Sequence, residues 1–278
     1  MENQEANNKV SVIMGIYNCE ETLAEAIDSI INQTYTDWQL IMCDDCSTDG
    51  TYRLAEEYRE RYPDRIILLK NEKNMRLSYS LNRCIEAADG RFVARMDGDD
   101  ISAPDRFEKQ VRYLEAHPDV QLVGTAMQRF DEKGLHDVDG KPEHPDRFIL
   151  RNDKPFNHAT IMTYRHVYDT LGGYTVSERT KRSQDYELWF RFYHAGFSGD
   201  NLPDALYLVR EDENAIKRRT FRVRRNSYLI MVNGYRLLGF PKRWLIKPTI
   251  MFIIKSLVPF KLQYKYRQWQ QRRSKAGG

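Results

Sequence analysis

The sequence predicts an α/β fold, a Rossmann-like and mostly parallel sheet with helices on both faces, followed by a basic helical extension. Two observations predict this fold. Short apolar runs alternate with segments of helical periodicity between residues 10 and 130. No acidic residue follows Glu213, and the remainder of the chain is basic and aromatic. We therefore divide the chain into a main domain, residues 1–213, and a tail, residues 214–278.

Apolar runs of strand length recur along the first half of the chain. The predicted strands are residues 10–17, 38–43, 66–70, 91–96 and 120–130. Helical periodicity and cap signals predict helices between them, at residues 21–33, 52–62, 77–88 and 104–117. Pro104 suits the first turn of the last of these helices. Strand, helix and strand in repetition are typical of a parallel sheet covered by helices.

The pattern is weaker after residue 131. Residues 133–145 are predicted to form a loop, and a strand is predicted at residues 159–164. Helices are expected at residues 166–171 and 183–195, with a Gly172-Gly173 break between them.

Composition limits the class of protein. The chain has 278 residues, 41% of them hydrophobic, which is enough for one large core or two modest ones. No uninterrupted apolar run reaches the roughly 18 residues of a membrane-spanning helix, and the polar N-terminus lacks the features of a secretory signal. We expect a cytoplasmic location. Cys43 and Cys46 match a C-x-x-C pair, but no second ligand pair accompanies them, so we expect no zinc site.

Charge is distributed unevenly along the chain. The tail holds 17 Lys and Arg, whereas the first 213 residues hold 26 basic and 40 acidic residues, a net charge of −14. Basic residues of the tail alternate with Trp, Phe, Ile and Leu between residues 242 and 265. This pattern indicates a helix on an anionic membrane surface, here the inner face of the cell membrane. Pro248 and Pro259 are expected to kink or divide that helix. A solvated helix bundle is the alternative.

Nucleic acid is the rival partner for any basic segment. It is disfavoured here because the main domain is acidic and no sequence signature of a nucleic-acid-binding fold is present. We therefore expect no nucleic-acid partner.

Polar side chains follow three of the predicted strands. Tyr17-Asn18 ends the first, Asp44-Asp45 the second, and Asp97-Gly98-Asp99-Asp100 the fourth. Since parallel strands end at one edge of a sheet, these clusters should converge, as ligand-binding residues do in such sheets. Helix caps and turns account for single acids at such places. They account poorly for five acids at two strand ends, because crowded carboxylates repel one another.

A divalent cation would relieve this repulsion. Asp97 and Asp99 are two residues apart on extended chain and can point the same way, and Gly98 permits close approach to the backbone. Carboxylate oxygens suit Mg²⁺ or Mn²⁺, which would neutralise charge on a leaving diphosphate. The chain has neither a P-loop nor a dinucleotide-binding G-x-G-x-x-G after its first strand, so those two enzyme classes are disfavoured.

Four segments together resemble the family 2 glycosyltransferases of the GT-A fold. They are residues 10–18, residues 33–45, the acidic motif at residues 97–100 and residues 183–189. The resemblance extends from about residue 10 to residue 214. It implies that residues 1–213 bind a nucleotide sugar and transfer the sugar with inversion of its anomeric centre.

The resemblance implies a role for each matching residue. Contacts with the nucleotide are implied for Ile16, Tyr17, Asn18, Asp44, Asp45 and Asp97. Asp45 is the acid expected at the nucleobase. Asp99 is the expected direct metal ligand, and Asp97 contacts the ribose or the metal. Asp185 is the expected catalytic base; by spacing alone, it is equally well a first-turn acid favoured by the helix dipole.

The resemblance also implies substrates. More narrowly, the chain resembles bacterial exopolysaccharide glycosyltransferases of the EpsE type, which help to make biofilm matrix. This implies a donor that is a UDP-sugar and an acceptor that is lipid-linked or an oligosaccharide. The Q-x-x-R-W motif of processive enzymes is missing, which favours the addition of a single sugar.

The sequence departs from the family pattern at two places. Gln184 stands where the family often has Glu, and Arg210-Glu211-Asp212 stands where it often has His. Glu211 or Asp212 could reach the metal. Candidates for contacts with phosphate or acceptor are Arg76, Arg95, His158 and Arg210. His158 is equally well interpreted as a structural histidine.

A second class of function is a protein that regulates a partner, alone or together with catalysis. Arg106, Lys109 and Arg112 fall on one face of the helix after Pro104 and could meet an acidic protein surface. A charged helix face is more often only a solvated one. The presence of Asp45, Asp97, Asp99 and Asp185 argues that catalysis is retained.

Overall fold

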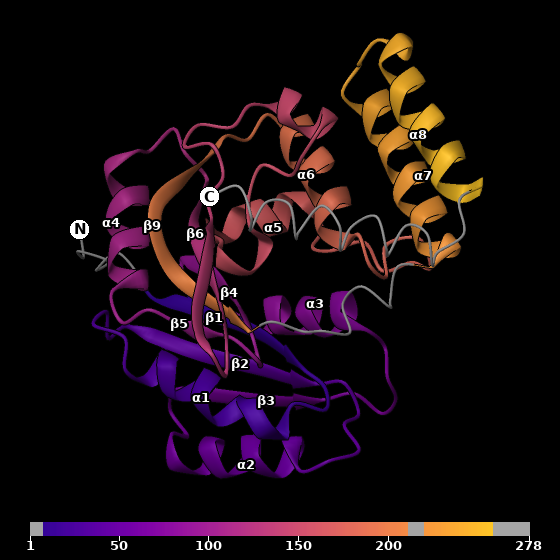
Figure 1. The fold of residues 1–278 in the computed structure, drawn as a ribbon. Coiled ribbons are helices and arrows are strands. Elements are labelled where there is room, and N and C mark those ends of the chain that lie inside the picture. Colours follow the sequence, from indigo (N-terminus) through magenta and orange to yellow (C-terminus); the bar gives the residue numbers. More distant parts are fainter. Residues whose placement is uncertain (1–7, 211–219, 258–278) are drawn as a thin grey trace.

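The computed structural model describes residues 8–210 and 220–257, and its centre is one mixed sheet (Figure 1). Within these residues the sheet has nine strands, in the order β3-β2-β1-β4-β8-β6-β9-β5, with β7 paired to β6. The prediction of an α/β fold with helices on both faces is confirmed.

Four parallel strands form the first half of the sheet. They are β1 (Val10–Ile16), β2 (Trp38–Asp44), β3 (Ile66–Lys70) and β4 (Phe92–Asp97). The register pairs Ile16 with Asp44 across β1 and β2, and Gly15 with Asp97 across β1 and β4. The polar clusters predicted at the strand ends therefore converge on one edge of the sheet.

Helices cover both faces because side chains of the central strands alternate between two hydrophobic clusters. Val12 belongs to the first cluster and Ile13 to the second, and both are fully buried. The first cluster contains residues of α1 (Glu20–Ile31), α2 (Thr51–Arg61) and α4 (Arg106–Ala116). The second contains residues of α3 (Leu77–Ala87), α5 (Arg165–Leu171) and α6 (Gln184–His194).

The predicted loop at residues 133–145 is wrong in part, because β7 (Gly134–Asp139) pairs antiparallel with β6 (Leu122–Asp131). The turn is made by Lys133, whose N–H donates to Asp131 Oδ1 at 2.7 Å, and by Gly134, whose φ is +116°. Backbone pairing holds this hairpin, while Leu135 and Val138 stay exposed. An apolar pattern was therefore missing from the sequence of β7.

The second half of the sheet is mixed rather than parallel. Here β8 (Met162–Tyr164) lies antiparallel between β4 and β6, preceded by two short 3₁₀ helices, η1 (Arg147–Arg151) and η2 (His158–Thr160). The long strand β9 (Gly199–Arg210) pairs parallel with β6 and antiparallel with β5 (Ile101–Ser102). We predicted neither β5 nor β9. The register between β6 and β9 shifts where Pro203 falls, since proline cannot donate to the ladder.

The described part of the tail forms α7 (Phe221–Leu237), η4 (Lys242–Leu245) and α8 (Ile246–Leu257), with α7 and α8 side by side beyond α6 (Figure 1). Ile230 and Tyr235 of α7 are buried in the second cluster. Phe252 of α8 stacks on Tyr228 of α7 with 4.8 Å between ring centroids.

The prediction that Pro248 kinks or divides the tail helix is wrong. Pro248 lies in the first turn of α8, where backbone N–H groups have no partner inside the helix in any case. Pro259 lies outside the described residues. Among the helices described, none has both the length and the apolar character that crossing a bilayer requires.

Candidate active site

A cavity of about 510 Å³ opens at the carboxyl ends of the parallel strands. Its walls come from five parts of the chain: the end of β1, the residue after β2, the loop before α3 with the start of that helix, the segment at residues 178–184 and the first turns of α7. Predicted nucleotide or phosphate residues in its lining are Ile16, Tyr17, Asp45 and Arg76. The structure thus brings together residues far apart in the sequence.

Three hydrogen bonds hold the Asp45 carboxylate in the cavity wall. Its Oδ1 accepts from Asn71 Nδ2 at 2.8 Å and from the Met75 N–H at 2.7 Å, and its Oδ2 accepts from the Arg76 N–H at 2.8 Å. A carboxylate that is only 4% exposed needs such donors, because an unpaired buried charge is costly. These bonds hold the carboxylate of Asp45 against the loop that follows β3.

Asp44, predicted to contact the nucleotide, is not part of the cavity lining. The side chain is fully buried, and its Oδ2 accepts from the Ser47 N–H at 3.2 Å. Its Oδ1 has no hydrogen-bond partner among the described residues. Asn18, at the end of β1, accepts from the Thr48 N–H through Oδ1 at 2.8 Å. These contacts tie the loop after β1 to the loop after β2.

Strained backbone is concentrated in the loops around the cavity. Three residues other than glycine have positive φ in the part of the chain described here: Asn18 at 47°, Cys46 at 63° and Arg76 at 78°. They lie in the loops after β1, β2 and β3. With a ψ of 161°, Arg76 occupies a region that is essentially restricted to glycine. Such strain is characteristic of functional sites.

Three carboxyl groups crowd together after β4. Asp97 pairs with the buried Arg95, with 2.6 Å between Oδ1 and Nη2. Burial and the charge of Asp97 raise the pKa of Asp99 above its usual value. Burial, with the charges of Asp97 and Asp99, raises the pKa of Asp100 to about 8. The charge of Arg95 therefore does not balance all three acids.

Gly98 allows a close approach, as the sequence predicted. A Cβ at this position would lie 3.1 Å from Cys19 Sγ and 3.2 Å from Ile16 Cγ2. The Gly98 carbonyl also accepts from Thr22 Oγ1 at 3.0 Å. The acidic turn at the end of β4, residues 97–100, is thereby packed directly on the end of β1.

The predicted phosphate candidate Arg210 reaches the acidic turn from the end of β9. Its backbone N–H donates to Asp100 Oδ1 at 2.9 Å, and its Nε donates to the Asp99 carbonyl at 3.2 Å. The guanidinium also pairs with Glu25 and lies over the Phe130 ring, 4.5 Å from its centroid. The neighbouring candidates Glu211 and Asp212 lie outside the described residues.

The acidic turn suits a hard divalent cation in its chemistry. Its donors are carboxylate oxygens, and burial, followed by the neighbouring carboxylates, raises the pKa values of Asp99 and Asp100, so a cation there would stabilise their charged forms. Within residues 8–210 and 220–257, no three His, Cys, Asp or Glu side chains are grouped as a metal site. Two carboxylates with phosphate oxygens of a donor would complete such a site. Metal binding by Asp97 and Asp99 stays a prediction.

Asp185 lies in the first turn of α6, and its neighbour Gln184 lines the cavity. Asp185 is 8% exposed. Its Oδ1 accepts from the Tyr186 N–H at 2.8 Å, and its Oδ2 forms an ion pair with Lys154 Nζ. The Oε1 atom of Gln184 is buried without a partner among the described residues. Gln184 thus stands in the cavity lining, and Asp185 is the residue that follows it in α6.

The contacts of His158 favour the structural interpretation of this residue. Its Nε2 lies 2.8 Å from the Tyr174 hydroxyl, which lies 2.9 Å from the Tyr168 hydroxyl. The ring also contacts Trp189 edge-on. Burial, with the positive charges of Arg95 and Lys154, holds the pKa of His158 well below 6.5. The side chain is therefore neutral at physiological pH.

The prediction of a basic partner face on α4 is wrong for one of its three residues. Arg106 is fully buried: its Nη2 donates to the Arg95 carbonyl at 2.9 Å and its guanidinium lies over the Tyr207 ring. Lys109 pairs with Asp105 and Asp204, and Arg112 pairs with Glu108. Acids on the same surface therefore balance the two exposed bases.

Sequence reasoning missed several residues of this site. Asn74 lines the cavity and Asn71 holds Asp45, and both follow the third strand, so the strand-end argument could have found them. Lys154 had no signal in the sequence. The cavity residues of α7, Arg222, Val223 and Asn226, had none either, because they belong to a part of the chain that we assigned to the tail.

Comparison with known proteins gives sequence matches along nearly the whole chain. A family model described as glycosyl transferase family 2 matches residues 11–171. A Bacillus subtilis (strain 168) protein that carries the name glycosyltransferase EpsE is 46% identical over 272 residues, covering 97% of this chain and 96% of that protein. The amylovoran biosynthesis glycosyltransferase AmsE of Erwinia amylovora is 32% identical over 269 residues, covering 93% and 98%.

Solved structures share the fold. Staphylococcus aureus TarS 1–349, in complex with UDP-GlcNAc, superposes with a TM-score of 0.65 at 18% identity, covering 83% of this chain and 70% of that one. The mannosyltransferase PcManGT from Pyrobaculum calidifontis, in complex with GDP-Man and Mn²⁺, gives a TM-score of 0.59 at 22% identity, covering 84% and 65%. The sheet and its helices are therefore arranged as in GT-A enzymes.

Proposed function

Because this chain belongs to glycosyl transferase family 2, we propose that it adds a single sugar, with inversion, from a nucleotide-diphosphate donor to a lipid-linked or glycan acceptor. The single observation that supports this most is the cavity at the strand ends. It combines a tightly held carboxylate, Asp45, with Gln184, the neighbour of a second carboxylate, Asp185. One end suits the nucleotide and the other suits the acceptor.

Donor binding is assigned to the wall formed by β1 and the loop before α3. Asp45 can accept from a nucleobase N–H, and Ile16 and Tyr17 flank it in the cavity lining. Asp97 is assigned to the ribose or the metal. We take the base to be uracil, because TarS was solved with UDP-GlcNAc and the resemblance of the sequence favours a UDP-sugar.

The diphosphate is assigned to the acidic turn and the arginines near it. Asp97 and Asp99 would hold Mg²⁺ or Mn²⁺, which supplies positive charge for the leaving diphosphate. We assign contacts with phosphate oxygens to Arg76 and Arg210, which is supported by Arg76 in the cavity lining and by the contact of Arg210 with the acidic turn. Arg95 is buried against Asp97, and we assign it to positioning that carboxylate.

Asp185 is assigned the role of general base. As the acceptor oxygen attacks the anomeric carbon, the bond from that carbon to the donor phosphate breaks and Asp185 takes the hydroxyl proton. One displacement of this kind inverts the anomeric centre. Base assistance contributes roughly 10²–10⁴-fold to the rate. No second carboxylate nucleophile is needed.

We place the reaction in bacterial exopolysaccharide synthesis at the inner face of the cell membrane. The names of similar proteins support the first part, since AmsE is named for amylovoran biosynthesis. The basic tail supports the second. Ile246, Ile250, Ile253 and Ile254 of α8 are about half exposed, beside lysines of the same basic segment. An apolar helix face flanked by cations suits an anionic lipid surface.

The proposal is tested by thermal shift with a panel of UDP- and GDP-sugars, each with and without Mn²⁺. We expect one class of donor to raise the melting temperature and Mn²⁺ to enlarge the effect. Asp99→Asn should lose the Mn²⁺-dependent part.

The second half of the test measures turnover as release of nucleoside diphosphate from the stabilising donor, with water as acceptor. Asp185→Asn should abolish this release and keep the donor-induced shift. Asp169→Asn, which changes an exposed acid on α5, is the matched control and should retain both. Full turnover by Asp185→Asn would contradict the assignment of the base, and no shift with any nucleotide sugar would contradict the donor site.

A further inference from the structure

The ion pair between Lys154 and Asp185 joins two segments that are 31 residues apart in the sequence. The Asp185 side chain is 11% exposed and the Lys154 side chain 46%. Because the ammonium group reaches a nearly buried carboxylate from solvent, it supplies the positive charge next to that carboxylate. A buried carboxylate without such a partner is costly, because burial removes it from water.

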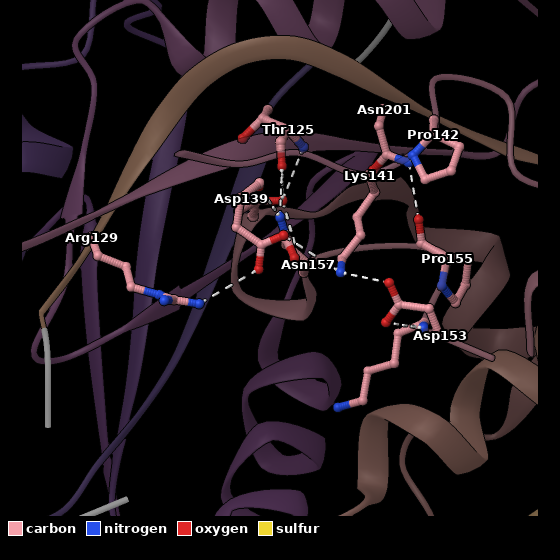
Figure 2. Close-up of polar contacts among 11 residues, drawn as sticks. Thr125, Arg129, Asp139, Lys141, Pro142, Asp153, Pro155, Asn157 and Asn201 are labelled. Atoms are coloured by element: carbon pink, nitrogen blue, oxygen red, sulfur yellow. Dashed lines mark hydrogen bonds and ion pairs between the residues drawn. The ribbon is translucent and has the colours of Figure 1, made fainter. Parts of the chain in front are cut away.

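The residues before and after Lys154, Asp153 and Pro155, are both held by polar contacts (Figure 2). Asp153 Oδ1 accepts from the Lys154 N–H at 2.8 Å, and Asp153 Oδ2 pairs with Lys141 Nζ at 3.0 Å. On the other side, the Pro155 carbonyl accepts from Asn201 Nδ2 at 3.0 Å. The position of Lys154 is therefore set by contacts from the loop after β7 and from β9.

A further contact connects this loop to the sheet. Asn157 Nδ2 donates to the Asp139 carbonyl at 2.8 Å, and the Asp139 carboxylate lies between Lys141, at 3.5 Å, and Arg129, at 4.0 Å (Figure 2). Asn157 is buried. This network links the hairpin β6–β7 to the segment that carries Lys154. The loop that positions the lysine is therefore held by contacts with the sheet.

We propose that Lys154 is a positioning residue for the base, which fixes the orientation of the Asp185 carboxylate and directs its free lone pairs toward the acceptor hydroxyl. This inference rests on the proposed function of Asp185. The Tyr186 N–H occupies Oδ1 and the ammonium group occupies Oδ2, so the carboxylate has one fixed orientation. When the acceptor oxygen bonds to the anomeric carbon, its proton moves to the carboxylate and Lys154 keeps all three of its own.

The test compares five variants of the full chain, Asp185→Asn among them, by steady-state release of nucleoside diphosphate from the stabilising donor, with water as acceptor. Lys154→Gln should lower kcat by about 10–100-fold, a part of the roughly 10²–10⁴-fold that a general base contributes. The KM for the donor should stay within about twofold, because Lys154 acts on the base and not on the nucleotide. Lys154→Arg keeps the charge and should recover most of kcat.

Two further variants separate this role from a structural one. Lys141→Gln removes a neighbouring ammonium group from the same network without touching Asp185, so it should change kcat far less than Lys154→Gln. In an Asp185→Asn background, Lys154→Gln should have no additional effect. A donor-induced thermal shift in each variant confirms folding, which the half-exposed position of Lys154 favours.

The possible outcomes distinguish the two ideas. If Lys154→Gln retains kcat within about twofold while Asp185→Asn is inactive, the inference about Lys154 is wrong and the base assignment stands. If Lys154→Gln and Lys141→Gln lower kcat equally, the lysine only braces the loop and the inference is also wrong. If Asp185→Asn itself retains turnover, the assignment of Asp185 as the base is wrong, and the inference about Lys154 is wrong with it.

Discussion

Arg76 combines a strained backbone conformation with a side chain that lines the cavity. Its φ of 78° and ψ of 161° belong to a region that other residues leave to glycine, yet an arginine occupies it. The Arg76 N–H donates to Asp45 and the side chain lines the cavity. We infer that the cost of this conformation, about 1–3 kcal/mol, is retained because the guanidinium is needed where it is.

Two substitutions of Arg76 separate backbone strain from charge. Arg76→Gly should give a protein more stable than Arg76→Ala by about 1 kcal/mol, because only glycine adopts this conformation without strain. Both variants remove the guanidinium and should weaken donor binding to the same extent. Urea unfolding measures the first difference and donor titration the second. An alanine variant as stable as the glycine variant would show that the position is unstrained.

His158 predicts a pH dependence of stability. The pKa of His158 is held well below 6.5 in the folded protein, and unfolding restores a pKa of about 6.5. The unfolded chain therefore binds an additional proton below that pH, and the free energy of unfolding falls as pH decreases from about 6.5 toward the folded-state pKa. Above that window the contribution of His158 is constant.

A glutamine substitution isolates this dependence. His158→Gln can retain a hydrogen bond to the Tyr174 hydroxyl and does not titrate. Urea midpoints measured at pH 7.5 and pH 5.5 should therefore differ more for the native protein than for the variant. Equal differences would mean that His158 takes up its proton without unfolding.

Helix α7 belongs to the catalytic body in its packing, although its sequence belongs to the basic tail. Gly234 packs against the Phe190 ring on α6, and a Cβ at Gly234 would lie 2.2 Å from Phe190 Cγ. The same helix contributes Arg222 and Asn226 to the cavity, and Arg222 pairs with Glu178 at 2.7 Å. The position of the cavity wall thus depends on the contact between two helices.

This dependence predicts a linked loss of stability and binding. Gly234→Val should destabilise the protein by about 1–3 kcal/mol, because a rigid side chain overpacks the contact between the helices. It should also reduce the donor-induced thermal shift, since α7 would move away from the cavity. Asn233→Val places the same side chain on the exposed face of the helix and is the matched control. A normal donor-induced thermal shift in Gly234→Val would show that α7 does not contribute to donor binding.

The main domain and the tail carry net charges of opposite sign. The first 213 residues have a net charge of −14, whereas every charged residue of the tail is Lys or Arg. In the described part, α8 adds a row of exposed isoleucines next to this positive charge. Each basic residue near an anionic surface contributes about 1 kcal/mol, so binding should combine both properties.

Vesicle flotation tests this combination. The full chain should float with vesicles of phosphatidylcholine and phosphatidylglycerol, and recovery should fall with phosphatidylcholine alone. Ile250→Asn with Ile254→Asn should lower recovery, because both side chains are about half exposed on α8. Leu135→Asn with Val138→Asn removes apolar surface from β7 instead and should have no effect. Equal recovery with and without the anionic lipid would argue against a membrane role.

Local pattern alone was sufficient for the first half of the fold. Apolar runs and helical periodicity located β1 to β4 and α1 to α4 within a few residues, because each of these elements has a buried face along its length. It was also sufficient for the acidic edge of the sheet, since parallel strands must end together. The strand β7 was not predicted because its side chains are largely exposed, and β9 was not predicted because Pro203 interrupts its pattern.

Contacts between distant elements were decided by packing. Arg106 looks like a surface base in sequence, yet it is buried between Arg95 and Tyr207, and Lys154 and Arg222 reach the site from segments without a motif. Periodicity describes only which face of an element is apolar. Which other element covers that face, and which charges then meet, depends on how the elements pack against each other in three dimensions.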